Sequence, residues 1–302
     1  MLARFLIFLP LAWAGQSIAR SARDESPCTD THIFLARGLN EDYPGRQGIL
    51  VKAICSAISA NSCDYEDILY HSTFDANYCD SIFEGIGNGI SQLHAYNKRC
   101  PNAQLVVSGY SQGAYVVGDM FAGGGGTFGD CVQGSNEGLD VTSEAGKKVT
   151  GVITWGSKRH TASQPYNTFS GAGKNGTYPR PIVELEALEK WKSVLIDYCV
   201  ITDPNCAGGN VNEDHWNYFE LYSEEAAEWV KSQVENNATA ASSSLDSSSI
   251  TDTTTQTSTP LSTASTTAAS GTSTSSSGSA ASTSHPLNLV GLAIAGSLAA
   301  CI

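Results

Sequence analysis

The residues best suited to chemistry lie in one short run, Gly109-Tyr110-Ser111-Gln112-Gly113. A serine with a glycine two places away on either side is the pattern of a sharp turn between a strand and a helix, with the serine exposed. The flanks fit, because 104–108 reads as a buried strand and 112–121 has helical spacing. The N–H of Gln112 then lies at a helix N-terminus, where it can bind a developing oxyanion. The run predicts Ser111 as a nucleophile.

A serine hydroxyl is a weak nucleophile at neutral pH and needs a general base. Chains that carry this turn follow the order serine, acid, histidine. That order favours His215, in a loop before the last helix, over the other histidines, which are His32, His71, His94, His160 and His285. Asp203 lies between Ser111 and His215, directly after a strand-like run. Its expected role is to orient the imidazole and stabilise the imidazolium without taking its proton.

Two cysteines, Cys199 and Cys206, enclose Asp203. We expect them to form a small disulfide loop that holds the carboxylate against the histidine. A C-x6-C segment with a nearby histidine could instead bind a metal. The chain has no C-x-x-C pair, however, and its nine cysteines are typical of an exported protein. The sequence therefore predicts no metal and no cofactor.

Two further patterns concern binding and modification. Gly85-x-Gly87-x-Gly89 falls inside a helical pattern with no strand before it, which argues against a dinucleotide-binding loop. N-glycosylation motifs begin at Asn175 and Asn237, and both are predicted acceptors in a secreted chain.

Both ends of the 302-residue chain read as processing signals. Residues 1–19 predict a secretory signal peptide, because an early arginine precedes a short apolar run and small residues. Residues 236–277 are rich in Ser and Thr and predict a disordered, O-glycosylated stalk. Residues 278–302 have the pattern of a GPI-attachment propeptide, with a tail-inserted helix or plain secretion as alternatives. Removing that tail also removes Cys301 and leaves eight cysteines, an even number suited to four disulfides.

We expect one folded domain over 27–235. Its apolar runs alternate between strand-like and helical spacing, which predicts an α/β fold with a parallel sheet covered on both faces. The strand-like runs lie at 31–36, 66–71, 104–108, 149–155 and 194–202, and the helical runs at 49–60, 81–97, 112–121 and 216–234. The 17 basic and 30 acidic residues give a formal charge of −13, which argues against nucleic acid or an anionic membrane surface as a partner.

These motifs together resemble those of the fungal cutinase and acetylxylan esterase family, carbohydrate esterase family 5. The segment 101–113 (PNAQLVVSGYSQG) matches the nucleophile signature of that family, and Cys199-x3-Asp203-x2-Cys206-x-Gly-Gly, followed by His215, is similar to its second signature. The resemblance spans about 28–232. It implies a compact α/β-hydrolase with a five-stranded parallel sheet and no large lid. It also implies Ser111, Asp203 and His215 as a catalytic triad.

The resemblance extends to the cysteines. It implies a bridge between Cys28 and Cys100 and matches Cys199–Cys206 directly. Cys55–Cys63 and Cys79–Cys131 are then taken as a guess for the four that remain.

The chain also departs from the family pattern. Leu39 stands where the family often has Ser or Thr, so its backbone N–H can join that of Gln112 in an oxyanion hole but no side-chain donor is present there; Asn40 is the neighbour that could substitute. Asn205 replaces a branched aliphatic residue. Trp155-Gly-Ser-Lys-Arg-His160 differs from the family's Gly-Asp-Pro-Arg turn, whereas the glycine run 123–126 looks more like acetylxylan esterases.

We expect a secreted, surface-tethered and monomeric serine esterase that acts on short-to-medium acyl esters. Its substrate is either an aliphatic polyester, as for a cutinase, or an acetylated polysaccharide, as for an acetylxylan esterase. Bulky apolar residues around the pocket would favour the first and an open polar cleft the second. The other hypothesis is a non-catalytic surface protein of the same fold, used for adhesion or carbohydrate binding. The candidate triad and the nucleophile turn argue against it.

Overall fold

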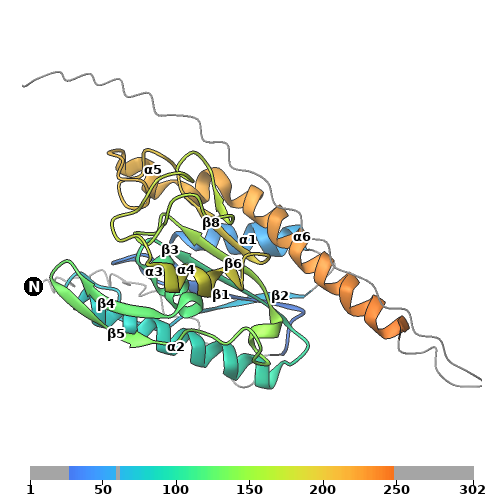
Figure 1. The fold of residues 1–302 in the computed structure, drawn as a ribbon. Coiled ribbons are helices and arrows are strands. Elements are labelled where there is room, and N and C mark those ends of the chain that lie inside the picture. The colour runs from blue at the N-terminus through green and yellow to red at the C-terminus, as the bar shows by residue number, and fades with distance from the viewer. Residues whose placement is uncertain (1–26, 59–61, 248–302) are drawn as a thin grey trace, which may run out of the picture. The chain divides into compact units, whose positions relative to one another are not determined.

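The computed structural model of the chain describes residues 27–58 and 62–247 (Figure 1). The predicted signal peptide, the GPI-attachment segment and the stalk beyond residue 247 lie outside the described residues. Within the described part of the chain, no helix combines the length and apolar character needed to cross a membrane.

The centre of the fold is a six-stranded parallel sheet with strand order β2-β1-β3-β6-β8-β7. The strands are β1 (Thr31–Ala36), β2 (Cys63–Asp67), β3 (Gln104–Tyr110), β6 (Val149–Trp155), β7 (Asn167–Thr168) and β8 (Leu195–Tyr198). Four of these strands fall on predicted runs, and the fifth, β2, begins three residues before the predicted run 66–71 and ends at Asp67. The sixth, β7, is a two-residue edge strand that is too short to leave a periodic signal. The α/β fold and the parallel sheet are confirmed.

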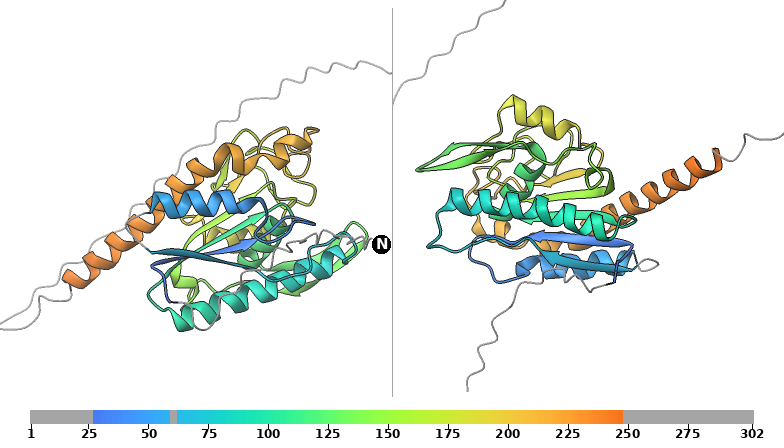
Figure 2. Two further views of the ribbon diagram at one scale, coloured as in Figure 1. Left: turned by 180° about the vertical axis from the view of Figure 1, so that it is seen from behind. Right: turned by 90° about the horizontal axis from the view of Figure 1, so that it is seen from below.

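Helices cover both faces of this sheet. They are α1 (Gly48–Ala57), α2 (Tyr78–Arg99), α3 (Gln112–Ala122), α4 (Ile182–Glu189), α5 (Asn212–Trp216) and α6 (Tyr218–Ser247), with short 3-10 turns η1 (Gly45–Gln47) and η2 (Gly146–Lys148). Figure 2 shows α1 and α6 side by side on one face and α2 on the other. Neighbouring strand residues alternate between the two resulting cores: Phe34 packs on the α2 side and Leu35 on the α1 side. Strands buried on both faces explain the continuous apolar runs.

Two regions differ from the expected element boundaries. The glycine run after α3 forms β4 (Gly124–Phe128), which pairs in antiparallel fashion with β5 (Cys131–Asn136). Helix α6 continues through residues 236–247, which we had placed in the disordered stalk. Alanine residues and the preceding helix favour this extension, because adding a residue to an existing helix is far easier than starting one.

Four disulfides join the eight described cysteines, in the same pairs as those implied by the resemblance and by the guess. Cys28–Cys100 ties the start of β1 to the end of α2, and Cys55–Cys63 ties α1 to β2. Cys79–Cys131 joins α2 to β5, and Cys199–Cys206 closes a short loop after β8. The glycines at 85, 87 and 89 lie within α2, as expected for a helix rather than a nucleotide-binding loop.

Candidate active site

Ser111 lies on a sharp turn between β3 and α3. Its backbone has φ 55° and ψ −113°, a conformation that residues other than glycine rarely adopt. A Cβ atom on Gly109 would lie 2.2 Å from the Gly113 carbonyl oxygen, and one on Gly113 would lie 1.9 Å from that of Ala36. Neither position can therefore accept a side chain. The Ser111 N–H donates to the Trp155 carbonyl oxygen at 2.9 Å, which fixes the turn against β6.

The three predicted catalytic residues meet at the carboxyl edge of the sheet. The Oγ of Ser111 lies 3.0 Å from the Nε2 of His215, and the Nδ1 of His215 lies 2.8 Å from Oδ2 of Asp203. With the Nδ1 proton held by the carboxylate, Nε2 carries the lone pair that can accept the serine proton. The serine is supplied by the end of β3, the acid by the loop after β8, and the histidine by α5.

Asp203 is fully buried, and both of its carboxylate oxygens accept hydrogen bonds. Its Oδ1 accepts from the N–H groups of Asn205 at 2.7 Å and Cys206 at 3.3 Å, and its Oδ2 accepts from the Tyr218 hydroxyl at 2.8 Å. Burial raises the pKa of Asp203, but the hydrogen bond and charge of His215, with the Asn205 and Tyr218 donors, outweigh it and leave the pKa below its ordinary value. The carboxylate is therefore ionised at neutral pH.

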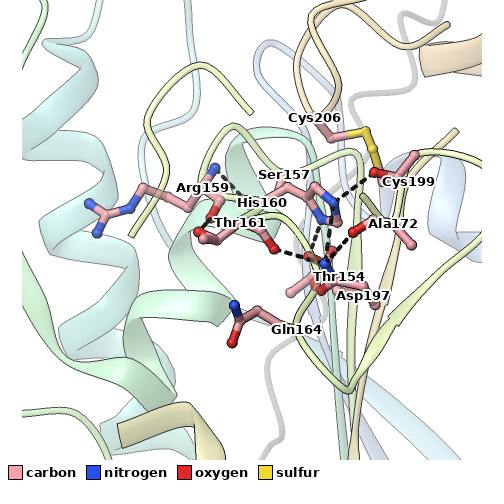
Figure 3. Close-up of polar contacts among 12 residues, drawn as sticks. Thr154, Ser157, Arg159, His160, Thr161, Gln164, Ala172, Asp197, Cys199 and Cys206 are labelled. Carbon is pink, nitrogen blue, oxygen red and sulfur yellow. Dashed lines mark hydrogen bonds and ion pairs between the residues drawn. A yellow bond between two sulfur atoms is a disulfide. The ribbon is translucent and has the colours of Figure 1, made fainter. Parts of the chain in front are cut away.

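The other histidines in the described part of the chain lie away from Ser111. His160, which follows β6, pairs its Nδ1 with Oδ2 of Asp197 at 2.6 Å and is buried (Figure 3). His32 stacks on Tyr96 inside the fold, and His71 contacts Glu84 at the surface. The order of the residues along the chain thus selected the histidine that the structure places beside Ser111.

The backbone N–H groups of Leu39 and Gln112 are the two predicted to form an oxyanion hole. Gln112 is the first residue of α3, so its N–H has no partner within the helix. Among the described residues, no hydrogen-bond acceptor is recorded for either N–H. The loop that carries Leu39 is fixed on both sides of it: the Gly38 N–H donates to Oε2 of Glu41 at 2.9 Å, and the Asn40 N–H donates to the Ser72 carbonyl oxygen at 2.7 Å.

Ser72, a residue that no sequence motif singles out, connects the Leu39 loop to Gln112. Its buried hydroxyl lies 2.9 Å from the Gly38 carbonyl oxygen and 2.6 Å from Oε1 of Gln112. The Nε2 of Gln112 in turn donates to the Ser81 hydroxyl at 3.1 Å. The Gln112 side chain is 1% exposed, so it serves as a structural tie beneath the site rather than a substrate contact.

Two departures from the family pattern lie at the site itself. The Leu39 side chain is half-buried beside the cleft, and the exposed Asn40, at φ 59°, makes no side-chain hydrogen bond among the described residues. The Nδ2 of Asn205 lies 2.9 Å from Nε2 of His215, on the same nitrogen that faces Ser111. Asn205 therefore touches the general base directly.

Two more supporting residues were missed by sequence reasoning. The hydroxyl of Tyr110 donates to the His215 carbonyl oxygen at 2.9 Å. A Cβ atom on Gly156, whose φ is +59°, would lie 2.7 Å from Nδ1 of His215 and 2.8 Å from Oδ2 of Asp203. A role for Gly156 near the site could have been predicted from its position, because it directly follows the buried strand 149–155.

A cleft of about 260 Å³ opens over Ser111. Charged and amide side chains form part of its wall, and apolar or aromatic groups form the rest. The lining residues are Leu39, Glu41, Arg46, Tyr78, Tyr110, Ser111, Gln112, Lys158, Asn205, His215 and Trp216. No cluster of metal-binding side chains occurs among the described residues.

A serine, an aspartate and a histidine that follow one another in this order along the chain and meet at the carboxyl edge of a parallel sheet define the α/β-hydrolase class. The chain belongs to the cutinase family, whose model matches residues 27–234, and it is a carboxylic-ester hydrolase.

Comparison with individual proteins gives relatives that are named cutinases and relatives that are named acetylxylan esterases. The chain is 29% identical to cutinase 11 of Verticillium dahliae over 240 residues, covering 76% of this chain and 78% of the relative. It is 28% identical to an acetylxylan esterase of Hypocrea jecorina, covering 70% of each chain. The catalytic core domain of acetyl xylan esterase from Trichoderma reesei superposes with a TM-score of 0.61 at 26% identity, covering 68% of this chain and all of that domain.

Proposed function

We propose that this protein hydrolyses short-to-medium acyl esters through a Ser111–His215–Asp203 triad and an acyl-enzyme. The observation that carries the proposal is the continuous contact from Ser111 Oγ to His215 Nε2, at 3.0 Å, and from His215 Nδ1 to Asp203, at 2.8 Å. The hydroxyl, the base and the orienting acid are thereby in reach of one another.

In the first half-reaction, Ser111 Oγ bonds to the ester carbonyl carbon while its proton passes to Nε2 of His215. The N–H groups of Leu39 and Gln112 stabilise the oxyanion of the tetrahedral intermediate. The imidazolium then gives its proton to the departing alkoxide, and an acyl-Ser111 remains. Water attacks that acyl group while His215 takes its proton, and collapse of the second intermediate returns the proton to Ser111 and releases the acid. No cofactor enters this scheme.

The cleft favours the acetylated-polysaccharide branch of the substrate range. Glu41, Arg46, Lys158 and Asn205 occupy its wall, and such polar groups suit a hydroxyl-rich alcohol portion better than a long aliphatic chain. The acetylxylan esterase relatives support the same branch. We infer that acetylated xylan is hydrolysed with a higher kcat/KM than a long-chain aliphatic ester, with cutin-like polyester as the competing substrate class.

Labelling with a fluorophosphonate probe tests the catalytic proposal. The wild-type protein should be labelled at Ser111 and should hydrolyse p-nitrophenyl butyrate, whereas S111A should lose labelling and at least about 10⁴-fold of kcat. S91A, which removes an exposed hydroxyl on α2, is the matched control and should behave as wild type. A wild-type protein that is neither labelled nor active would support the non-catalytic adhesion or carbohydrate-binding role instead. Parallel assays on acetylated xylan and a long-chain p-nitrophenyl ester then rank the substrate classes.

We further propose that the protein is exported and acts as a monomer, with residues 1–19 removed and a GPI anchor added within 278–302. Release of the protein from intact cells by phosphatidylinositol-specific phospholipase C would test the anchor. Of the two predicted glycosylation sites, Asn175 is the better placed: its exposed side chain uses Oδ1 to accept from the Ala162 N–H at 2.8 Å, whereas Nδ2 of Asn237 donates to Gln104 at 3.1 Å. A glycosidase-sensitive mobility shift should therefore be lost mainly in N175Q.

A further inference from the structure

Lys158 is the one residue of the turn 157–160 that lies in the wall of the cleft. This turn follows β6, and its other members, Ser157, Arg159 and His160, are 3%, 2% and 1% exposed. Lys158 is half-buried and lines the same cleft as Ser111 and His215. Gly156, the residue just before this turn, packs directly on His215 and Asp203, so the turn begins at the triad.

The turn is anchored from both sides, which fixes where Lys158 stands. Figure 3 shows the side chains of Arg159 and His160 directed away from each other. The Arg159 guanidinium pairs with the buried Glu184 and donates to the Tyr115 hydroxyl at 3.1 Å, while His160 pairs with Asp197 at 2.6 Å. The Lys158 carbonyl oxygen accepts from the Tyr178 N–H at 2.8 Å. The backbone that carries Lys158 is therefore fixed before a substrate arrives, and the Tyr78 ring is the side-chain contact of its ammonium group.

Within residues 27–58 and 62–247, the ammonium group of Lys158 has no carboxylate partner. Its Nζ lies 5.0 Å from the centre of the Tyr78 ring, and no carboxylate among the described residues comes within 4.0 Å of it. Two carboxylates of the site have other partners: Glu41 pairs with Arg46 at 3.0 Å, and Asp203 pairs with His215. Burial lowers the pKa of Lys158, as expected for a cation that has lost part of its water without gaining a counter-ion.

We propose that Lys158 forms an anion subsite of the cleft, so that the enzyme favours esters that carry a carboxylate in the same molecule. This inference rests on the proposed esterase function and narrows its substrate class. The chain as a whole carries a formal charge of −13, which repels an acidic substrate. A positioned cation beside the nucleophile offsets that repulsion at short range. The carboxylate could belong to the acyl portion or to the alcohol portion of the ester, and the chemistry at Lys158 is the same in either case.

Two pairs of substrates separate these sources. Methyl hydrogen adipate and methyl hexanoate differ by a carboxylate on the acyl side, and 6-acetoxyhexanoate and hexyl acetate differ by one on the alcohol side. For each pair, kcat/KM is measured at neutral pH and the charged-to-neutral ratio is calculated. Dividing the wild-type ratio by that of a variant cancels the intrinsic reactivity of the two esters. The variants are K158Q and K158E, with K174Q as the control that removes an exposed lysine outside the cleft and causes the same change in net charge.

In at least one pair, the charged-to-neutral ratio of the wild type should exceed that of K158Q by about fivefold or more. The ratio should fall further in K158E, stay at the wild-type value in K174Q, and decline toward the K158Q value in 0.5 M salt, because salt screens partly exposed charges. A K158Q ratio equal to that of the wild type in both pairs would overturn the subsite while leaving the esterase function intact. The proposed function, and the subsite with it, would instead be overturned if the wild type hydrolysed none of the four esters and its activity on p-nitrophenyl butyrate were no higher than that of S111A.

Discussion

At the scale of single residues, the proposed oxyanion hole consists of two backbone N–H groups, those of Leu39 and Gln112, without a side-chain hydroxyl at residue 39. Leu39 occupies the place where relatives often carry Ser or Thr, and the neighbouring Asn40 side chain is exposed rather than directed into a hydrogen bond. The loop itself is well fixed through Glu41 and Ser72. The proposed hole therefore has a fixed backbone but lacks a side-chain donor at residue 39.

The variant L39S should restore that donor and raise kcat on p-nitrophenyl butyrate. Removal of one oxyanion donor in other hydrolases costs roughly 10²–10³-fold, so even partial recovery should give about a tenfold gain or more. KM should change little, because the oxyanion forms only in the transition state. L39A serves as the control, since it shortens the side chain without supplying a hydroxyl. Equal kcat for L39S and L39A would contradict this interpretation.

Asn205 should limit the rate by a different route. Its Nδ2 and the Ser111 hydroxyl lie 2.9 Å and 3.0 Å from the same His215 nitrogen, so two donors compete for one lone pair. N205V, which restores an aliphatic side chain, should raise kcat/KM by roughly fivefold, the equivalent of about one hydrogen bond of 1 kcal/mol. The Asn205 backbone N–H, which supports Asp203, is retained in this variant. A lower kcat/KM in N205V, with the melting temperature unchanged, would show that the amide assists the base.

The triad was predictable because chain order and the nucleophile turn leave little freedom in the choice of residues. Ser72 and Tyr218 were not, since the sequence shows only that each is a common polar residue. Ser72 reaches Gln112 across 40 positions of the chain, and Tyr218 reaches Asp203 across 15. Such contacts depend on how loops pack in three dimensions, which periodicity and spacing do not report.

At the scale of elements, the buried pair of His160 and Asp197 joins the turn after β6 to strand β8. Burial lowers the pKa of His160, but Asp197 and the Gly171 carbonyl oxygen outweigh it and raise the pKa above its ordinary value. Asp197 also accepts from the Thr154 hydroxyl at 2.7 Å, so the pair joins strands β6 and β8 (Figure 3). The pair therefore stabilises the fold most when His160 is protonated.

The pH dependence of unfolding follows from the sign of that shift. A histidine whose pKa is higher in the folded than in the unfolded chain contributes its full stability below pH about 6.5 and loses it as pH rises through the folded value. The wild type should thus have a higher free energy of unfolding than D197N. This difference should be largest at pH 5.5–6.5 and should shrink at higher pH. D130N, which alters an exposed carboxylate in the β4–β5 turn, should show no such trend. Denaturant unfolding across pH measures both, and a difference that grows with pH would contradict the assignment.

Three of the predicted strands, β1, β3 and β6, are buried on both faces, where apolar side chains must follow one another. β4, β5 and β7 were missed because they lack a continuous buried apolar run. β7 has two half-buried residues, and the glycine-rich β4 has no side chains to alternate. The length of α6 was also underestimated, because residues 236–247 at its C-terminal end are small and polar, like those of the predicted stalk.

At the scale of the whole molecule, the four disulfides have unequal roles. Cys28–Cys100 spans 72 positions, whereas Cys199–Cys206 spans 7 and holds the loop that carries Asp203. The loop-entropy relation gives a stabilisation of about 4 kcal/mol for the long loop and about 2 kcal/mol for the short one. Stability and activity should therefore respond to different bridges.

The double variant C28A/C100A should lose more free energy of unfolding than C199A/C206A, by about 2 kcal/mol. C199A/C206A should lose more kcat, because the Asp203 carboxylate is then held by a loop that is free to open. Denaturant unfolding and kcat on p-nitrophenyl butyrate, measured on both proteins at a temperature where both are folded, test the two statements. The reverse ranking of kcat would show that the small bridge does not position the acid.

The last helix begins three residues after His215 and runs for 30 residues. At 1.5 Å of rise per residue it is about 45 Å long, and Figure 1 shows its far end projecting beyond the body of the domain. Anything fastened there, whether a bead, an electrode or a fibre, would lie well clear of the mouth of the reaction site. Immobilisation through residues near 247 should accordingly leave bulky polymeric material free to approach, whereas attachment near the amino end of the same helix would obstruct it.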